Sequence, residues 1–279
     1  MRSDLPKIGL ALSGGAARGM AHVGVLRALL ENNIPIDCVA GTSAGSIVAG
    51  AFAAGMSIDE IADFGRALRW RDIGRVTMSR LGIQSNERLE QYLRTRLPLT
   101  KFEEMRVPFA AVATDLKTGS AVVMKDEGDV PFAIRASCTI PGWYVPVLDS
   151  EGRQLVDGGL VAVVPSTVTR SLGADLVIAV DVNSEGATFI TPSSSVIGVL
   201  LQSMMVVQKT ASSHQLEMSD LVISPKVGHI RWDEMGRAEE LIAAGYEAGV
   251  ESISRIRELI ETVTADDSDF KTRSALISF

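Results

Sequence analysis

The chain has 279 residues, 46% of them hydrophobic, and a net charge of −7. This length and apolar content suffice for one large α/β domain with a complete core. The negative net charge argues against nucleic acid as a partner and against a polybasic segment that binds anionic lipid. The two cysteines, Cys38 and Cys138, are too few for a disulfide framework and lack metal-ligand spacing. We therefore expect a reducing, cytoplasmic setting and no bound metal or cofactor.

The start of the chain does not have the pattern of a signal peptide. An acid and a proline lie among the first residues, and glycines occupy the place of a signal's apolar segment. No run of 18 apolar residues is present, so no membrane span is expected. Any contact with lipid is then expected from the soluble side, as a peripheral contact at the inner membrane face.

The first 55 residues predict a βαβ unit. Residues 7–12 form an apolar strand, residues 13–19 a glycine-rich loop and residues 20–31 a helix with one apolar face. A second apolar strand follows over residues 36–40. A right-handed crossover makes these strands parallel, so the loops that follow them meet at one edge of the sheet.

The second strand runs directly into Gly41-Thr42-Ser43-Ala44-Gly45 and then into a helix of small residues. A strand that turns into a helix through G-x-S-x-G is a nucleophile elbow. Gly41 and Gly45 are required because bulkier neighbours would collide where the chain doubles back. Ser43 is the candidate nucleophile; the alternative is a capping serine in an ordinary turn.

The remaining elements are predicted from local signals along the chain. In order, they are helices over 58–68 and 86–96, a strand pair over 108–114 and 121–125, a helix over 130–137, a strand over 154–156, a helix from Pro165, a strand over 176–182, and then a helix over 196–208, a strand over 221–224 and a helix over 237–261. We expect residues 1–264 to form one hydrolase domain, with a cap over the site at 70–105. Residues 184–195 are expected to form a flexible loop and residues 265–279 a mobile tail.

An acyl-transfer serine needs hydrogen-bond donors for the oxyanion that develops on the substrate. Gly14 and Gly15 allow backbone N–H groups to face one point, and Arg18 adds a positive charge close by. A dinucleotide or phosphate cradle is the competing interpretation. It is disfavoured because the G-x-G-x-x-G spacing fails at Ala16 and no lysine follows the loop.

The base for Ser43 is less evident. The order Ser43, Asp157 and then His214 or His229 would suit a conventional triad, but neither histidine lies in a glycine-bounded loop at a strand end. His22 is interpreted as a packing or helix-positioning residue. Asp157 is better placed to act as the base, because it lies at the end of a predicted strand and precedes two glycines. Only a dry site would raise its pKa enough for it to act as a base; otherwise it is a turn-forming residue.

Three motifs together resemble the patatin-like phospholipase family, and within it the bacterial proteins related to the catalytic domain of neuropathy target esterase. They are the glycine loop at residues 14–19, the elbow at 41–45 and Asp157-Gly158-Gly159. Supporting stretches are HVGVLRAL, ATDLKTG, ASCTIPGWYVPV and RAEELIAAGYEAG. The resemblance covers residues 7–260.

The resemblance implies a three-layer α/β/α sandwich around a mostly parallel sheet. It also implies a lipid acyl hydrolase with a Ser43–Asp157 dyad, in which the glycine loop forms the oxyanion hole and Gly158 and Gly159 shape the base loop. Ala16 stands where the family has a third glycine. Alanine keeps its N–H, so the hole is expected to persist provided that φ at Ala16 is negative.

Two other functions stay open at this point. One is a catalytically weak regulator that binds lipid or a protein partner on the same fold, favoured only by Ala16. The other is an esterase with a histidine-containing triad. The candidate acyl-chain contacts, for which core packing is the stronger interpretation, are Phe52, Met56, Met204 and Met205.

Overall fold

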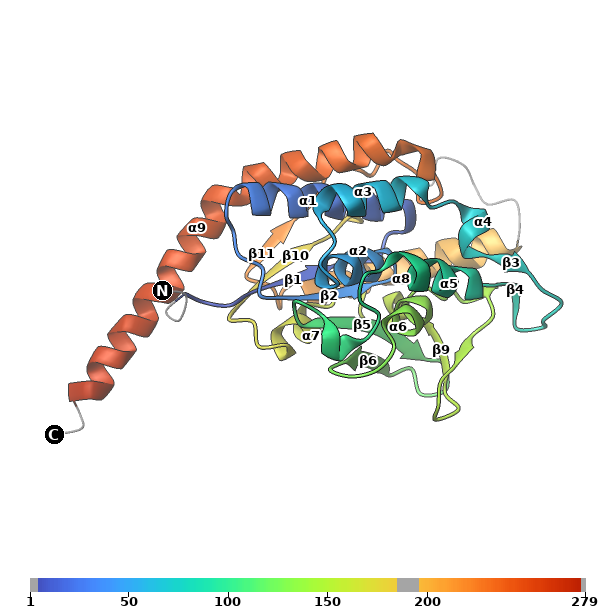
Figure 1. The fold of residues 1–279 in the computed structure, drawn as a ribbon, viewed down its shortest axis with the longest axis horizontal. Helices are drawn as coiled ribbons and strands as arrows, with labels where there is room; N and C mark the ends of the chain where they lie inside the picture. Colours follow the sequence, from blue (N-terminus) through green and yellow to red (C-terminus); the bar gives the residue numbers. More distant parts are fainter. Residues whose placement is uncertain (1–4, 185–195, 277–279) are drawn as a thin grey trace.

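A mostly parallel sheet of eight strands lies at the centre of the computed structural model, which describes residues 5–184 and 196–276 (Figure 1). Five neighbouring parallel strands are β11 (Leu221–Ile223), β10 (Leu176–Val180), β1 (Ile8–Leu12), β2 (Cys38–Thr42) and β5 (Phe109–Asp115). The antiparallel strands are β6 (Ala121–Lys125) and β9 (Gln154–Asp157), which pair with β5, and β8 (Val147–Leu148), which pairs with β9.

The strand β5 is paired along both of its edges. Residues 110–112 pair with β2 and also with β6, so those two strands occupy opposite edges. Residues 113 and 114 pair with β6 and also with β9. It follows that β2 and β9 share one edge of β5 and approach each other along it from opposite directions.

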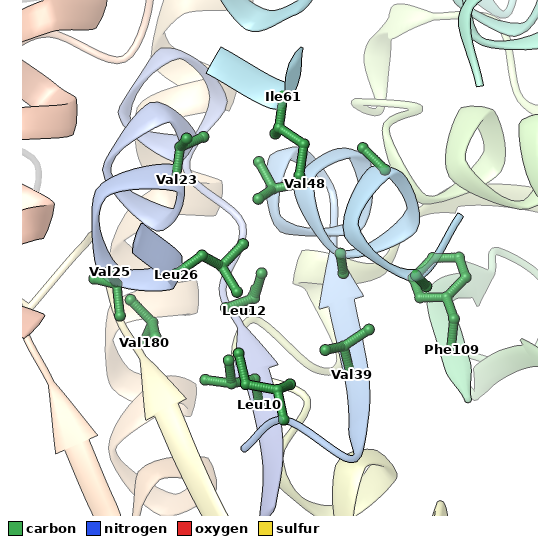
Figure 2. Packing of buried hydrophobic residues seen from close by; sticks show 14 of the residues in the cluster. Leu10, Leu12, Val23, Val25, Leu26, Val39, Val48, Ile61, Phe109 and Val180 are labelled. Atoms are coloured by element: carbon green, nitrogen blue, oxygen red, sulfur yellow. The ribbon is translucent and has the colours of Figure 1, made fainter. Parts of the chain in front are cut away.

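The two faces of the sheet carry different helices, which confirms the three-layer architecture. Ile8, Leu10 and Leu12 belong to the core beneath α1 (Met20–Glu31), α2 (Ala44–Ala53) and α3 (Ile58–Ala67), as Figure 2 shows for Leu10 and Leu12. The alternate residue Ala11 packs in the second cluster, beside Val163 and Leu172. The helices α7 (Ser166–Ser171) and α8 (Val196–Leu216) belong to this second side.

The long helix α9 (Ala238–Leu276) packs closely on α1 (Figure 1). A Cβ added at Gly24 would overlap the carbonyl oxygen of Ile242, and one at Gly245 would overlap that of Ala21. The two backbones can approach this closely only because both positions lack a side chain. Glycine at these two positions therefore sets the spacing between α1 and α9.

The region between α3 and β5 holds several short elements. They are α4 (Trp70–Ile73), α5 (Glu87–Arg96), the short helix at Phe102–Glu104, and the strands β3 (Arg75–Val76) and β4 (Gly82–Ser85), which form a second sheet with β7 (Gly142–Tyr144). Among them only α5 is predicted from the sequence, because strands of two to four residues carry no periodic signal.

Two helices extend beyond their predicted ends. α8 continues from Gln208 to Leu216, and α9 continues from Glu261 to Leu276. Neither extension contains a glycine or a proline. Helices usually end at glycine or proline, so a polar composition without either residue does not end these two helices. The loop predicted at 184–195 lies outside the described residues except for its first position.

The helix α6 (Val130–Ser137) has the predicted bounds, and α3 begins with the predicted capping box between Ser57 and Glu60. Asp129 caps the start of α6, because its side chain accepts from the N–H of Phe132. This helix delivers Ser137 and, just beyond it, Thr139 to the edge of β5 where β2 and β9 meet.

Candidate active site

Register across β5 brings Ser43 and Asp157 together. Thr42, the last residue of β2, lies opposite Val112, and Asp157, the last residue of β9, lies opposite Ala113. Ser43 directly follows Thr42. Since β2 and β9 share one edge of β5 and run toward each other, their carboxyl ends meet there. Two side chains 114 positions apart in sequence therefore become neighbours.

Ser43 stands in a backbone conformation that L-residues seldom adopt. Its φ is 51° and its ψ is −124°, and α2 begins at the next residue. The Ser43 N–H donates to Ser137 Oγ at 2.8 Å, and its carbonyl accepts from the Ser46 N–H at 2.9 Å. An added Cβ at Gly41 would lie 2.5 Å from Ser46 Cα, and one at Gly45 would overlap the Leu12 carbonyl oxygen. The two glycines are thus a steric requirement of this turn.

Asp157 is buried, with 4% of its surface exposed. The Gly159 N–H donates to Asp157 Oδ1 at 2.8 Å, and the Asp157 N–H donates to the Thr139 carbonyl at 2.7 Å. Burial raises the pKa of Asp157 to about 6, although hydrogen bonds with the Ser43 side chain and the Gly159 N–H act to lower it. A carboxyl group with this pKa can exchange a proton near neutral pH.

The two glycines after Asp157 allow neighbouring parts of the chain to approach it closely. A Cβ at Gly158 would overlap the carbonyl oxygen of Val112, and one at Gly159 would lie 2.6 Å from Gln208 Nε2. Gly158 therefore lets the chain pass against β5, and Gly159 lets α8 approach Asp157. The short helix at Gly158–Leu160 completes the turn.

The first glycine loop presents two backbone donors beside Ser43. The Gly14 N–H is already used, since it donates to the Val163 carbonyl at 3.0 Å. The N–H groups of Gly15 and Ala16 form no hydrogen bond with any residue that the structure describes. Both residues line the same cavity as Ser43. Of the three predicted backbone donors, Gly15 and Ala16 are the ones available to a ligand.

Ala16 differs from the sequence-based expectation. Its φ is +48°, so the negative φ on which the expected oxyanion hole depends is not found, although the Ala16 N–H is still present in the loop. This left-handed conformation costs an L-residue roughly 1–2 kcal/mol, whereas glycine adopts it freely. The surrounding contacts hold Ala16 there: the next residue, Ala17, donates its N–H to the Trp232 carbonyl at 2.9 Å.

Arg18 is buried and serves the loop after β11. Its Nε donates to the Ile230 carbonyl at 2.7 Å, and an Nη donates to the Gly228 carbonyl at 3.1 Å. The guanidinium thus holds residues 228–230 against the glycine loop. The loop after β11 also brings Trp232 and Met235 to the cavities beside Ser43.

Two cavities meet at Ser43. The first, of about 810 Å³, extends from Ser43 under α3 and α4 and is lined by residues such as Ile47, Ile61, Phe64 and Trp70. The second, of about 600 Å³, lies under α8 and includes Asp157. Ser43, Ala16 and Ile140 line both.

The three histidines have other partners. His214 hydrogen-bonds to Glu217 at 3.1 Å and His229 to Glu240 at 2.8 Å, and both histidines are exposed. Neither lines the two cavities. His22 is fully buried, and its Nε2 lies 2.9 Å from the Ser13 carbonyl oxygen. Burial lowers the pKa of His22 to about 4, so the ring is neutral and Nε2 donates this bond.

Several residues near Ser43 were not assigned an individual role from the sequence. Ser137 and Thr139 accept the backbone N–H groups of Ser43 and Asp157, and Trp232 and Gln208 line the second cavity. Met204 and Met205 line that cavity too, whereas Phe52 and Met56 pack against the core. A single polar residue in a helix or loop has no local pattern, so only long-range contacts identify these roles.

None of the described helices is long and apolar enough to cross a bilayer. Among the described residues, no three histidine, cysteine, aspartate or glutamate side chains cluster as metal ligands would.

Comparison with known proteins identifies related sequences. A family model described as patatin-like phospholipase matches residues 10–169. An uncharacterised NTE family protein of Mycobacterium tuberculosis is 39% identical over 188 residues, covering 66% of this chain and 51% of that protein. Lysophospholipase NTE1 of Mycosarcoma maydis is 40% identical over 185 residues (63% of this chain, 10% of that protein). The rat patatin-like phospholipase domain-containing protein 7 is 31% identical over 281 residues (87% and 20%). The chain thus spans about half the length of the mycobacterial relative and less of the others.

Two solved structures have a similar fold. VipD from Legionella pneumophila has a TM-score of 0.52 at 14% identity, covering 90% of this chain and 67% of that one. Human GIVD cytosolic phospholipase A2, solved with a fluorophosphonate inhibitor, has a TM-score of 0.50 at 13% identity, covering 95% and 61%. These likenesses concern the fold.

Proposed function

Because the chain belongs to the patatin-like phospholipase family, we propose that it is a serine hydrolase that cleaves fatty acyl esters of lipids, of the phospholipase A, lysophospholipase or esterase type. The observation that carries this proposal is the meeting of Ser43 and Asp157 at one edge of β5. Lysophospholipase NTE1 of Mycosarcoma maydis, which is named for an activity of this class, supports the proposal.

In the first half of the reaction, the Asp157 carboxylate takes the proton from the Ser43 hydroxyl while Oγ attacks the acyl carbon of the ester. The carbonyl oxygen becomes an oxyanion, which the N–H groups of Gly15 and Ala16 stabilise. Each such donor contributes on the order of 3 kcal/mol to transition-state stabilisation. The tetrahedral intermediate then collapses: the ester C–O bond breaks, and Asp157 returns the proton to the leaving alcohol.

In the second half, Asp157 takes a proton from water as the water oxygen attacks the acyl-Ser43 carbonyl. The bond to Ser43 Oγ breaks, Oγ regains a proton from Asp157, and the fatty acid leaves. One carboxyl group thus acts as base and acid in turn, which is efficient when its pKa lies near the working pH. The pKa of about 6 at Asp157 supports this role.

The two alternatives have less support. A histidine-containing triad would need an imidazole beside Asp157, whereas His214 and His229 contact exposed glutamates. A weak regulator would follow from a collapsed oxyanion loop, whereas Gly15 and Ala16 border the cavity with Ser43 and their N–H groups have no partner among the described residues.

The exposed apolar surface supports a peripheral contact with a membrane. The hairpin of β3 and β4 exposes Met78 fully and Val76 and Leu81 largely, and α8 exposes Val199, Leu200, Val206 and Val207. Figure 1 shows both elements at the same end of the molecule. Residues 73–86 include two arginines and no acid, and α8 also contains no acid, although the chain as a whole is acidic. This pattern of apolar and basic side chains suits an anionic lipid surface.

The proposed activity is tested with a fluorophosphonate probe followed by mapping of the labelled peptide. We expect one adduct, on Ser43, and release of fatty acid from p-nitrophenyl butyrate and lysophospholipid. Ser43→Ala removes both labelling and turnover, and Asp157→Asn removes turnover. Alanine at both His214 and His229 leaves turnover within about twofold. A folded wild-type chain without an adduct on Ser43, or loss of turnover in the double histidine variant, would contradict the proposal.

A further inference from the structure

The nucleophile lies at the junction of two cavities that differ in chemistry. The first cavity is bordered, apart from Ser43, by aliphatic, aromatic and sulfur-containing side chains and by glycines, and none of the described residues around it is charged. The second contains the Asp157 carboxyl and the amides of Asn183 and Gln208, together with Leu201, Met204 and Met205 of α8.

Asp157 lines the second cavity but not the first. This asymmetry matters because the leaving oxygen of an ester must receive a proton as the bond to the acyl carbon breaks. If Asp157 supplies that proton, the leaving oxygen has to lie on the Asp157 side of Ser43. The rest of the alcohol then continues into the cavity that Asp157 borders.

We propose that the two cavities divide the substrate: the acyl chain lies in the first cavity, under α3 and α4, and the alcohol lies in the second, under α8. This assignment rests on the proposed hydrolase function and adds to it the direction in which an ester binds. The oxyanion donors fit this orientation, since Ala16 borders both cavities and the carbonyl carbon must lie between them.

The lining of the second cavity also defines the class of alcohol. Three apolar side chains of α8 form one wall, and two neutral amides lie among the polar groups. The Asn183 amide donates to the Gly14 carbonyl at 2.7 Å, so part of its capacity is already used. Apart from Asp157, no described residue that borders this cavity is charged. The site therefore suits a bulky, partly apolar alcohol such as an acylated glycerol, and none of the described residues around it supplies a cation to bind a phosphate.

The acyl side is tested with Ile47→Trp. Ile47 is partly buried and lies one helical turn after Ser43, so the larger ring would fill the entrance of the first cavity. The substrates are p-nitrophenyl esters from butyrate to palmitate, whose leaving group stays constant and needs little proton transfer. We expect the ratio of kcat/KM for dodecanoate to that for butyrate to fall about tenfold or more, and Ile47→Val to leave it within about twofold.

The alcohol side is tested with Met205→Trp, with Met205→Leu as its matched control. The acyl group is held at butyrate while the substrate changes from p-nitrophenyl butyrate to dibutyrylglycerol and to a butyryl-glycerophosphocholine. We expect Met205→Trp to lower kcat/KM for the two glycerol esters about tenfold relative to the p-nitrophenyl ester, without moving the acyl-length optimum. Wild-type rates on dibutyrylglycerol and on the phosphate-bearing ester should agree within about fivefold, because no cationic side chain among the described residues borders the cavity.

Crossed results would overturn the assignment: Ile47→Trp altering the choice of alcohol, Met205→Trp moving the acyl-length optimum, or neither variant changing either ratio. A strong preference for the phosphate-bearing ester would overturn the description of the alcohol site. These outcomes differ from failure of the proposed function, which is loss of Ser43-dependent turnover in the wild-type chain itself. Circular dichroism and fluorophosphonate labelling of each variant show that it is folded with a reactive Ser43.

Discussion

The carboxyl group of Asp157 is buried among neutral groups, and this placement links catalysis to stability. Its pKa in the folded chain, about 6, lies above the ordinary value of 3.8. The folded chain therefore holds the Asp157 proton more tightly than the unfolded chain does. As pH rises from about 4 to 6, the unfolded state loses this proton first, and the contribution of Asp157 to stability becomes unfavourable.

Asp157→Asn should therefore stabilise the chain at neutral pH while it abolishes turnover. Asparagine keeps an oxygen for the Gly159 N–H and carries no charge to bury. We expect the free energy of unfolding to increase at pH 8 by up to about 3 kcal/mol, and the difference to shrink as pH approaches 4. Urea unfolding of both chains at pH 4.5 and pH 8 measures this. A variant that is less stable than the wild type at pH 8 would contradict the burial argument.

In the wild type, kcat/KM should fall about tenfold per pH unit below about pH 6.

Ala16 provides a second test at the scale of one residue. Its φ of +48° is unfavourable for alanine and natural for glycine. Ala16→Gly should leave the free energy of unfolding unchanged or raise it by up to about 1 kcal/mol, because relief of strain offsets the extra flexibility of the unfolded chain. Turnover should stay within about twofold, since the N–H is retained.

The matched control is Ala243→Gly, at an exposed position inside α9. There the same substitution should destabilise the chain by about 1 kcal/mol. Equal destabilisation at both positions would mean that Ala16 is not strained.

At the scale of elements, α6 determines the geometry of the elbow. Ser137, its last residue, accepts the Ser43 N–H, and Thr139 just beyond it accepts the Asp157 N–H. One helix end thus fixes the backbone of both residues. A shift of α6 along β5 would change both positions together.

Ser137→Ala should leave the Ser43 N–H without its acceptor. We expect the free energy of unfolding to fall by about 1–3 kcal/mol and kcat to fall more than KM rises, because the position of Oγ is loosened. Denaturation and steady-state kinetics measure the two effects. Ser252→Ala serves as the control, since that hydroxyl bonds only to its own helix at the Ala248 carbonyl, and it should change neither quantity appreciably. An unchanged kcat in Ser137→Ala would remove this role from α6.

Elements with strong local signals were predicted well from the sequence. The apolar faces of α1 and α6 and the capping box of α3 lie within a few residues of one another in the chain. The parallel strands and the elbow at Ser43 follow from similar local patterns. The antiparallel pairing of β9 on the edge shared with β2 does not, because it depends on register with β5. The positive sign of φ at Ala16 likewise depends on contacts with residues more than 200 positions away.

At the scale of the whole molecule, the hairpin of β3 and β4 is expected to carry part of the contact with lipid. Met78→Asp combined with Leu81→Asp should reduce co-sedimentation with vesicles of anionic phospholipid at least about fivefold, because burying a charged side chain in the interface is costly. Hydrolysis of soluble p-nitrophenyl butyrate should be unchanged, since neither residue lines the cavities.

Val250→Asp makes the same exchange of an exposed apolar residue for an acid on α9, away from the hairpin. It should leave vesicle binding unchanged. Equal losses in both variants would indicate a general effect of charge, and no loss in the hairpin variant would exclude the hairpin as the contact.

The fit of α9 against α1 through Gly24 and Gly245 also affects when the protein can first act during its synthesis. The loop that carries Trp232 and Met235 to the cavity walls lies directly before α9, and it is held between Arg18 and that helix. A ribosome-bound chain that has emerged only as far as Asp157 holds both side chains of the proposed dyad but lacks those walls. We therefore expect the proposed lipid cleavage to begin only after the stretch around Gly245 has left the exit tunnel, so that unfinished chains leave the surrounding membrane intact.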